Sequence, residues 1–224
     1  MHNRSLNRLK SGAFLFALSI FYPLAAPAAA QSLANRGVGF TRPPNDLFGT
    51  APIFAPLGRY QEQWTRARQN AVLNPRLQEL VAPARGLGRL QQLAFVQSRV
   101  HQEIRWRSDA TEWGRHDYWA SADETLSHGA GDMEDRAVVK MQALMALGFN
   151  PGDLFLTLGR DKVGGPISLL VVRMGADRYW TLDDLGGAPI AAARRAGFTP
   201  IMSMSTTGQW LHGYRVASRG AGGR

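Results

Sequence analysis

The sequence predicts an α+β domain in which helices come first and an antiparallel sheet follows. Up to residue 148, apolar residues recur three and four positions apart, which is the spacing of helices that bury one face. Beyond residue 153, short runs of β-forming residues alternate with glycine-containing turns, which predicts strands. The chain has 224 residues, enough for one substantial domain.

Residues 1–30 predict an export signal. A basic start, an apolar run and a small-residue cleavage site follow one another: Arg4, Arg8 and Lys10, then residues 13–22, then Ala28, Ala29 and Ala30. The apolar run is short for a membrane span, although an uncleaved N-terminal anchor is the alternative. We therefore expect a periplasmic or secreted protein with no membrane span after signal cleavage.

The composition excludes two classes of function. The formal net charge is +9, but the basic residues are spread along the chain without an aromatic–basic motif, so we expect no nucleic-acid partner. The chain contains no cysteine. Disulfides, thiolate nucleophiles and thiolate metal sites are therefore excluded.

The segments that flank the domain have low-complexity compositions. Residues 31–58 are rich in glycine and proline, which interrupt any periodicity and predict an extended arm without a core of its own. The domain is expected over residues 59–217. The Gly- and Arg-rich residues 218–224 predict a disordered tail.

Three helical stretches are predicted before residue 107. The first covers residues 59–73, and a short helical piece follows between Pro75 and Pro83. The third covers residues 90–106 and is amphipathic. The residues expected to face the core are Tyr60, Trp64, Ala67 and Ala71 in the first helix, and Leu90, Leu93, Ala94, Val96, Val100 and Ile104 in the third.

The segment from residue 109 to residue 126 shows little regular periodicity. It contains Trp113, Tyr118 and Trp119, whose large rings with polar ends suit a loop packed against a helix. We expect these rings to be buried in the core rather than to contact a substrate.

A central helix is predicted from Asp132 to Gly148. Asp132 is a good N-cap residue, and Glu134 and Asp135 lie in the first turn, where the helix dipole favours acids. Gly148 stands where a C-terminal cap belongs. The buried face is expected to contain Val138, Met141, Leu144 and Met145.

Strands are predicted at residues 154–158, 167–174, 178–182, 201–205 and 210–216. The second and third are expected to form a hairpin, because the turn Gly175-Ala176-Asp177 separates them. A second turn is expected at residues 183–187.

The entrance to the central helix resembles a known motif. The segment is similar to the nucleophile motif of the bacterial transglutaminase-like cysteine proteinases (the LapG-like family), with methionine where the family has its cysteine: Gly131-Asp132-Met133-Glu134-Asp135-Arg136-Ala137. Further matches lie at residues 106–109, 117–120, 182–183 and 210–214, so that the resemblance covers residues 59–215. It implies a papain-like, transglutaminase-type core with the central helix packed on the antiparallel sheet.

The resemblance also implies three catalytic positions. They are Met133 in place of the cysteine, Ile167 in place of the histidine, and Asp183, which retains the carboxylate. A cysteine peptidase needs a thiolate and an imidazole base, so the chain is expected to be inactive. The alternative is a peptidase with a substituted nucleophile that uses Ser127, His128 and Asp183.

The same resemblance implies a calcium site. Asp132 and Glu134 match acidic positions that bind calcium in LapG-like members, and oxygen ligands suit Ca²⁺. Helix capping explains both residues without an ion, so the two interpretations remain open.

The sequence-based hypothesis is an exported, inactive homologue of these peptidases. It would act as a protein-binding or regulatory module in the cell envelope, with an adhesin-like target or a membrane receptor as its partner. The alternatives are the peptidase with a substituted nucleophile and an envelope structural protein.

Overall fold

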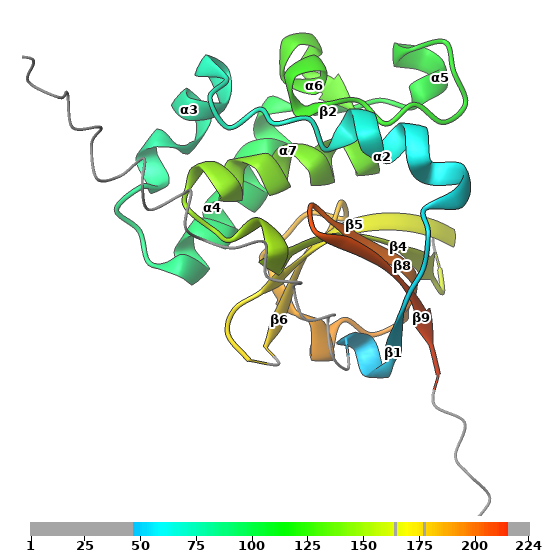
Figure 1. Ribbon diagram of the computed structural model, residues 1–224. Helices are drawn as coiled ribbons and strands as arrows, with labels where there is room; N and C mark the ends of the chain where they lie inside the picture. Colours follow the sequence, from blue (N-terminus) through cyan, green and yellow to red (C-terminus); the bar gives the residue numbers. More distant parts are fainter. Residues whose placement is uncertain (1–46, 164, 177, 215–224) are drawn as a thin grey trace, which may run out of the picture. The chain divides into compact units, whose positions relative to one another are not determined.

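A computed structural model describes residues 47–163, 165–176 and 178–214 of the chain (Figure 1). The predicted export signal, residues 31–46 of the predicted arm and the predicted tail lie outside the described residues. Among the described residues, no helix combines the length and apolarity needed to cross a membrane.

Helices dominate the first part of the chain and strands the second, as predicted. The α-helices are α2 (Gln61–Ala67), α3 (Pro75–Val81), α4 (Arg89–Glu103), α5 (Asp109–Glu112), α6 (Ala122–His128) and α7 (Met133–Ala146). The 3-10 helices are η1 (Leu47–Gly49), η2 (Gly58–Tyr60), η3 (Ala82–Ala84), η4 (Pro151–Asp153) and η5 (Ala192–Arg194).

Seven antiparallel strands form the main sheet, in the order β1-β9-β8-β4-β5-β6-β7. They are β1 (Ala51–Phe54), β4 (Leu154–Asp161), β5 (Gly165–Arg173), β6 (Tyr179–Leu182), β7 (Ile190–Ala191), β8 (Phe198–Ser205) and β9 (Gly208–Gly213). A separate parallel pair joins β2 (Arg105–Trp106) to β3 (Ala130–Gly131). The five predicted strands and the predicted hairpin of β5 with β6 are confirmed, whereas β1 and β7 were not predicted.

The α-helices lie together on one face of the sheet, with α7 across its middle (Figure 1). Residues 135–144 of α7 are all buried, because α7 is enclosed by the sheet below and by α3, α4 and α6 around it. A second apolar cluster covers the opposite face of the sheet and includes Phe155, Leu169, Val171 and Trp210. The first residues of α7 are therefore partly exposed, whereas the middle of the helix is buried between the sheet and the other helices.

The end of α7 follows the predicted signal. Gly148 has φ +80°, a left-handed conformation that glycine adopts without strain. Its N–H donates to the Met145 carbonyl at 2.9 Å, and the Phe149 N–H donates to the Leu144 carbonyl at 3.0 Å. This pair of bonds is the Schellman motif, so Gly148 is confirmed as the C-terminal cap.

Two predicted helices differ from the observed ones. The helix predicted over residues 59–73 ends at Ala67, because the chain then turns toward Pro75. In α4, Leu90 and Ala94 are exposed, which corrects their assignment to the core, whereas Gln92 and Gln97 are buried. Both glutamines reach backbone carbonyls, of Ala84 and Asp183 respectively, so hydrogen bonds rather than apolarity decide which side of α4 faces inward.

The predicted loop 109–126 contains two helices, α5 and α6. Helix α6 begins with a reciprocal capping box, in which the Ser121 hydroxyl accepts from the Glu124 N–H and the Glu124 carboxylate accepts from the Ser121 N–H. The Ser-x-x-Glu spacing is the sequence signal for such a box, which explains why a helix begins here instead of the predicted loop. Trp119 is buried, as predicted, and stacks on Tyr60 with 5.3 Å between ring centroids.

Strand β1 forms one edge of the sheet and pairs with β9. The Ala55 N–H donates to the Gln209 carbonyl on β9. Because backbone groups alternate in direction along a strand, those of Ile53 and Ala51 also face β9. Pro52 therefore lies at a position whose N–H would point away from the sheet, and proline has none. The predicted arm thus contributes an edge strand whose free side lacks a donor at Pro52.

Candidate functional site

The entrance to α7 is shaped by two glycines. Gly129 ends α6 with φ +63°, and β3 then runs beside β2, where the Arg107 N–H donates to the Gly131 carbonyl at 3.0 Å. A Cβ on Gly131 would lie 2.7 Å from the Cβ of Asp135, closer than real Cβ contacts. Only glycine at position 131 leaves room for the Asp135 side chain beneath the first turn.

Met133 is the first residue of α7. Its half-buried side chain packs against the apolar cluster on the far face of the sheet, which also contains Ile167. Ile167 is buried on β5. The two positions matched to a nucleophile and a base therefore belong to one apolar environment, which needs no hydrogen-bond partner.

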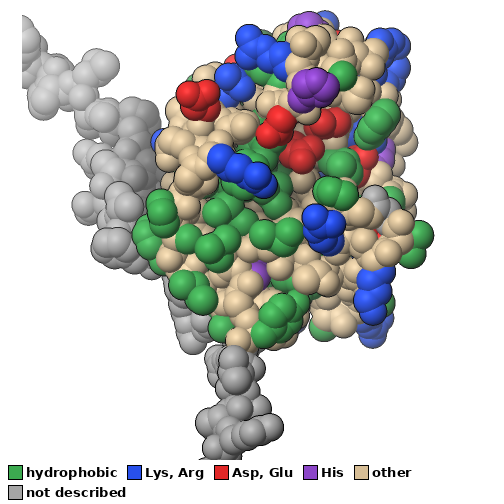
Figure 2. Space-filling view, turned by 90° about the vertical axis from the view of Figure 1, so that its right-hand side faces the viewer, with side chains coloured by type: hydrophobic (Ala, Val, Ile, Leu, Met, Phe, Trp, Pro, Cys, Tyr) green, Lys and Arg blue, Asp and Glu red, His purple; other side chains and the backbone are tan. Residues whose placement is uncertain are grey.

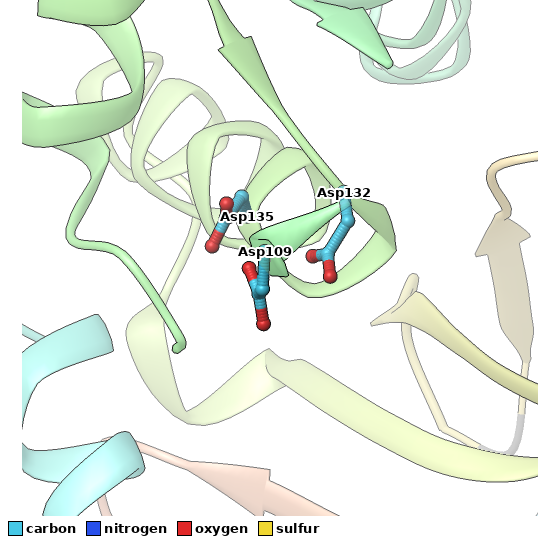
Figure 3. Close-up of side chains that lie close together, drawn as sticks. All are labelled: Asp109, Asp132 and Asp135. Carbon is cyan, nitrogen blue, oxygen red and sulfur yellow. The ribbon is translucent and has the colours of Figure 1, made fainter. Parts of the chain in front are cut away.

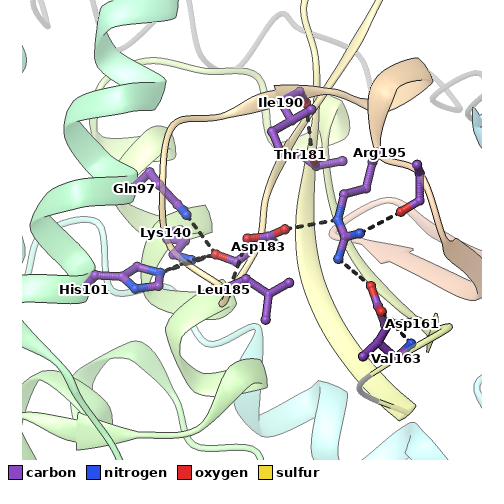
Figure 4. A network of polar contacts seen from close by, with 11 residues as sticks. Gln97, His101, Lys140, Asp161, Val163, Thr181, Asp183, Leu185, Ile190 and Arg195 are labelled. Atoms are coloured by element: carbon purple, nitrogen blue, oxygen red, sulfur yellow. Dashed lines mark hydrogen bonds and ion pairs between the residues drawn. The ribbon is translucent and has the colours of Figure 1, made fainter.

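Asp183, the third matched position, is fully engaged in structural contacts (Figure 4). Its carboxylate accepts from the Leu185 N–H at 3.1 Å and from Arg195 Nε at 3.1 Å. Arg195 also donates to Asp161 at 2.8 Å. The carboxylate that would orient a histidine in a triad instead holds a guanidinium.

The carbonyl of Asp183 is the meeting point of a second set of donors (Figure 4). Gln97 donates to it at 2.8 Å, and Lys140, from the middle of α7, donates at 2.9 Å. Lys140 also donates to His101 Nε2 at 3.1 Å. Desolvation is the main reason that the pKa of Lys140 falls to about 8, and desolvation together with the Lys140 charge lowers the pKa of His101.

A salt bridge next to Asp183 extends this network. Arg136, one turn before Lys140, pairs with Asp184 at 3.0 Å and donates to the Ile104 carbonyl at 2.7 Å. The turn that carries the matched carboxylate is therefore fixed to α4 and α7 by paired charges and satisfied hydrogen bonds.

The residues of the substituted-nucleophile alternative have other partners. His128 Nδ1 contacts Glu112 at 2.9 Å, and its ring lies 4.5 Å from that of Trp113. Ser127 is exposed. Among the described residues, no hydrogen bond joins Ser127, His128 and Asp183.

Ser168 points away from Ile167, as expected for neighbours on a strand. Its hydroxyl donates to Glu134 Oε1 at 2.8 Å, so it reaches the entrance of α7. This bond also fixes Glu134, one of the two predicted calcium ligands, against β5.

One serine–histidine pair was not predicted. Ser203 Oγ and His212 Nε2 are 2.8 Å apart, and His212 Nδ1 lies 2.7 Å from the Thr50 hydroxyl. That hydroxyl donates to the Leu47 carbonyl, so it accepts from Nδ1–H and leaves Nε2 as the acceptor from Ser203. Ser203 is completely buried, and burial lowers the pKa of His212 to about 4. This pair is therefore a neutral link between β8 and β9, and Thr50 extends it to the residue before β1.

Three carboxylates meet at the entrance of α7 (Figure 3). Asp109, Asp132 and Asp135 each offer an oxygen, and these atoms lie within 4.8 Å of one another. Asp132 occupies the N-cap position, but its side chain makes no capping hydrogen bond, which corrects the expectation that it caps the helix. The side chain turns toward Asp109 and Asp135 instead of the free amides (Figure 3).

The acidic side chains of this cluster are not paired with basic ones in the described part of the chain. No arginine, lysine or histidine forms a salt bridge with Asp109, Asp132, Glu134 or Asp135 within the part of the chain that the structure describes. Desolvation, then the neighbouring carboxylates, raise the pKa of Asp132 to about 10. Desolvation likewise raises the pKa of Asp135 to about 7 and the pKa of Asp109. Asp132 therefore holds a proton at neutral pH unless a cation is present.

The donor set fits a calcium ion. Asp109 and Asp135 each use one oxygen to accept a backbone N–H, from Tyr118 at 2.6 Å and from Ala120 at 2.7 Å. The other oxygens, Asp109 Oδ1 and Asp135 Oδ2, are buried and meet no hydrogen-bond donor in the described part of the chain. Oxygen-only ligands with negative charge are what Ca²⁺ prefers. The structure thus joins Asp132 to Asp109 and Asp135, whereas the sequence suggested Asp132 and Glu134.

An apolar row runs from the entrance of α7 across the sheet. Beginning next to Ser168, cross-strand register places four apolar residues beside one another on the helix-covered face: Leu158, Met202, Leu211 and Ile53. Met202 is buried, but Leu211 is 42% and Ile53 58% exposed, because the helices do not extend over β9 and β1. Figure 2 views the side on which α2, β1 and β9 lie and shows hydrophobic side chains gathered beneath a group of acidic ones.

Comparisons with known proteins agree with this architecture. Residues 60–212 match the family model described as bacterial transglutaminase-like cysteine proteinase. The fold is similar to that of Legionella pneumophila LapG, with a TM-score of 0.55 and 23% identity over 72% of this chain and 90% of that chain. Calcium-bound Legionella pneumophila LapG has the same TM-score and identity, over 74% of this chain and 94% of that chain. No curated protein shows significant sequence similarity to the chain.

Proposed function

We propose that this chain, which belongs to the family of bacterial transglutaminase-like cysteine proteinases, is an exported member that has lost catalysis and binds a protein partner in the cell envelope. The main support for the proposal is the identity and the contacts of the three residues at the matched catalytic positions. Met133 and Ile167 share an apolar environment, and the Asp183 carboxylate holds Arg195. The absence of cysteine from the sequence supports the same conclusion.

Export is proposed from residues 1–30, whose basic start, apolar run and alanine-rich end match a signal peptide. An envelope location would bring the chain into contact with the adhesin-like proteins or membrane receptors that the family resemblance suggests as partners.

Partner binding is supported by the surface beside the inactive triad. The apolar row ends in Leu211 and Ile53, whose exposed side chains extend one face of the sheet beyond the helices. A row of this kind offers van der Waals contact to an extended polypeptide, and the acidic entrance beside it offers charge. The retained scaffold would then hold a segment that an active relative would cut.

Calcium is proposed to bind at Asp109, Asp132 and Asp135. When bound, the ion would neutralise the cluster and replace the proton that Asp132 otherwise keeps. The two oxygens without partners support this assignment. The calcium-bound structure of the similar Legionella pneumophila protein is consistent with it.

The experiment that tests the proposal is capture of envelope proteins on the immobilised full chain, with calcium present. The Leu211→Glu variant should lose at least 90% of the captured protein, because a charge would interrupt the apolar row. Leu185→Glu is the matched control, since Leu185 is also exposed but follows β6, four strands away from β9. Capture that Leu211→Glu leaves unchanged would contradict the proposed surface.

A fluorophosphonate probe tests the rival activity on the same sample. The probe labels activated serines, and the wild-type chain should remain unlabelled because Ser203 is buried and Ser127 has no histidine partner among the described residues. Labelling that is lost on Ser127→Ala or Ser203→Ala would instead support a peptidase with a substituted nucleophile.

A further inference from the structure

We propose that a cavity on the sheet face opposite α7 binds a small apolar carboxylate. The cavity measures about 540 Å³, within the range of roughly 300–1,000 Å³ that is usual for small-molecule sites. It lies at β6, η5, η1 and the start of β8, and contains none of the carboxylates at the entrance of α7. The proposal is therefore independent of the function proposed above.

Aromatic and alanine side chains form much of the cavity wall. Three rings lie on this face of the sheet, namely those of Phe48, Tyr179 and Phe198. Phe48 meets Phe198 edge to face, with 4.9 Å between centroids and 62° between the ring planes. Aromatic walls of this kind favour a flat or acyl apolar body.

Two backbone features hold the rings in place. Phe48 has φ 55°, in the left-handed region that a residue with a side chain rarely adopts. Phe198 lies across Gly159, where a Cβ would come within 2.5 Å of the ring, so only glycine fits beneath it. The wall is thus built from an uncommon backbone conformation and a position restricted to glycine.

Both charged residues among those that line the cavity are arginines, Arg178 and Arg195. Arg195 is held from behind by Asp183 and Asp161 and donates also to the Ala196 carbonyl. A guanidinium has five N–H donors, so these three bonds leave two N–H groups without a partner in the part of the chain described.

Arg178 contributes the second charge. Its side chain is exposed, and it forms no salt bridge within the described residues. Both arginines line the cavity, so a carboxylate bound there would accept N–H groups from two guanidinium ions, whose planar donors match its two oxygens. The aromatic walls would hold the apolar part of the same molecule.

The proposal is tested by isothermal titration of the full chain with indole-3-acetate, octanoate and neutral indole. At least one acid should bind, and indole should bind at least tenfold more weakly than indole-3-acetate. The two acids distinguish an aromatic from an acyl body. No heat with either acid, or equal affinity for indole and indole-3-acetate, would overturn the proposal.

Two variants locate the binding. Ala193→Trp fills the cavity from an exposed position and should weaken binding at least tenfold, and Arg178→Gln should do so for the acids but not for indole. Ala196→Trp is the matched control, because Ala196 is exposed but does not line the cavity. Unchanged thermal unfolding verifies that each variant folds, and acid binding that survives Ala193→Trp would overturn the assignment.

Discussion

Helix α7 passes through two regions that bury charge in opposite ways. At its entrance, Asp109, Asp132 and Asp135 face one another without a cation among the described residues. Further along the helix, Arg136 and Lys140 meet carbonyls, a histidine and a carboxylate, and almost every polar atom has a partner. The same helix thus contributes to one region where like charges are grouped and to another where charges are paired.

Whether the buried charges are paired indicates which region stabilises the fold and which region binds a ligand. Charges that are paired inside a protein hold its parts in one arrangement. Removing one partner destabilises the fold, because the other charge remains buried without compensation. Charges of one sign grouped together oppose folding unless something else binds there. We therefore interpret the network around Lys140 as structural and the acidic entrance as a site for a ligand.

The largest expected effect comes from breaking the paired region. Arg195→Met leaves the carboxylates of Asp183 and Asp161 without their guanidinium, and should lower the free energy of unfolding by about 3–5 kcal/mol. Urea unfolding measures the change. Arg194→Met, at the exposed neighbouring position, should stay within about 0.5 kcal/mol of the wild type. Similar effects of the two variants would show that Arg195 is not structurally paired.

Calcium should stabilise the chain by binding at the acidic entrance of α7. An ion that binds the native state alone raises the free energy of unfolding by about 2.7 kcal/mol at a hundredfold excess over its Kd. Thermal unfolding with calcium and with chelator should show this shift, and Asp132→Ala should abolish it. Glu103→Gln, which alters an exposed acid on α4, should retain it. An equal midpoint in calcium and chelator would mean that the cluster holds protons instead.

The smallest effect concerns pH and sharpens the contrast. The raised pKa of Asp132 means that the folded chain keeps a proton that the unfolded chain releases above its ordinary pKa of 3.8, so the wild type loses stability as the pH rises toward about 10. The amide in the Asp132→Asn variant does not titrate in this range. In chelator, Asp132→Asn should therefore gain stability relative to the wild type by about 2 kcal/mol between pH 5 and pH 6.5.

Urea unfolding at the two pH values measures this difference, and the contribution of His212 cancels because both proteins contain it. A stability difference that does not change with pH would show that the carboxylates at the entrance are ionised in the native chain.

The fold was largely predictable because its signals are local. Apolar runs identified five strands, and Gly148 identified the end of α7. Errors arose where hydrogen bonds decide burial. Gln92 and Gln97 face the core because carbonyls lie within reach, which a hydrophobic pattern does not reveal. Strand β1 escaped prediction because its four residues include Pro52 and it is held by β9, more than 150 positions later.

The site was predictable only in part. The resemblance located Met133, Ile167 and Asp183, but no local pattern links Arg195 to Asp183. Asp109 lies near Asp132 and Asp135 because β2 pairs with β3. Since Asp109 is distant from the other two along the chain, no local pattern links it to them. The Ser203–His212 pair depends on cross-strand register, which the sequence does not specify.

The proline in β1 has a consequence for selectivity. A partner that adds a strand to a sheet binds mainly through backbone groups, which are the same in every sequence. Pro52 removes a donor from one edge, and the strand at the other edge, β7, has only two residues. A polypeptide that binds this sheet therefore has to be recognised through its side chains on a face, so recognition depends on which residues it carries and not merely on its being extended.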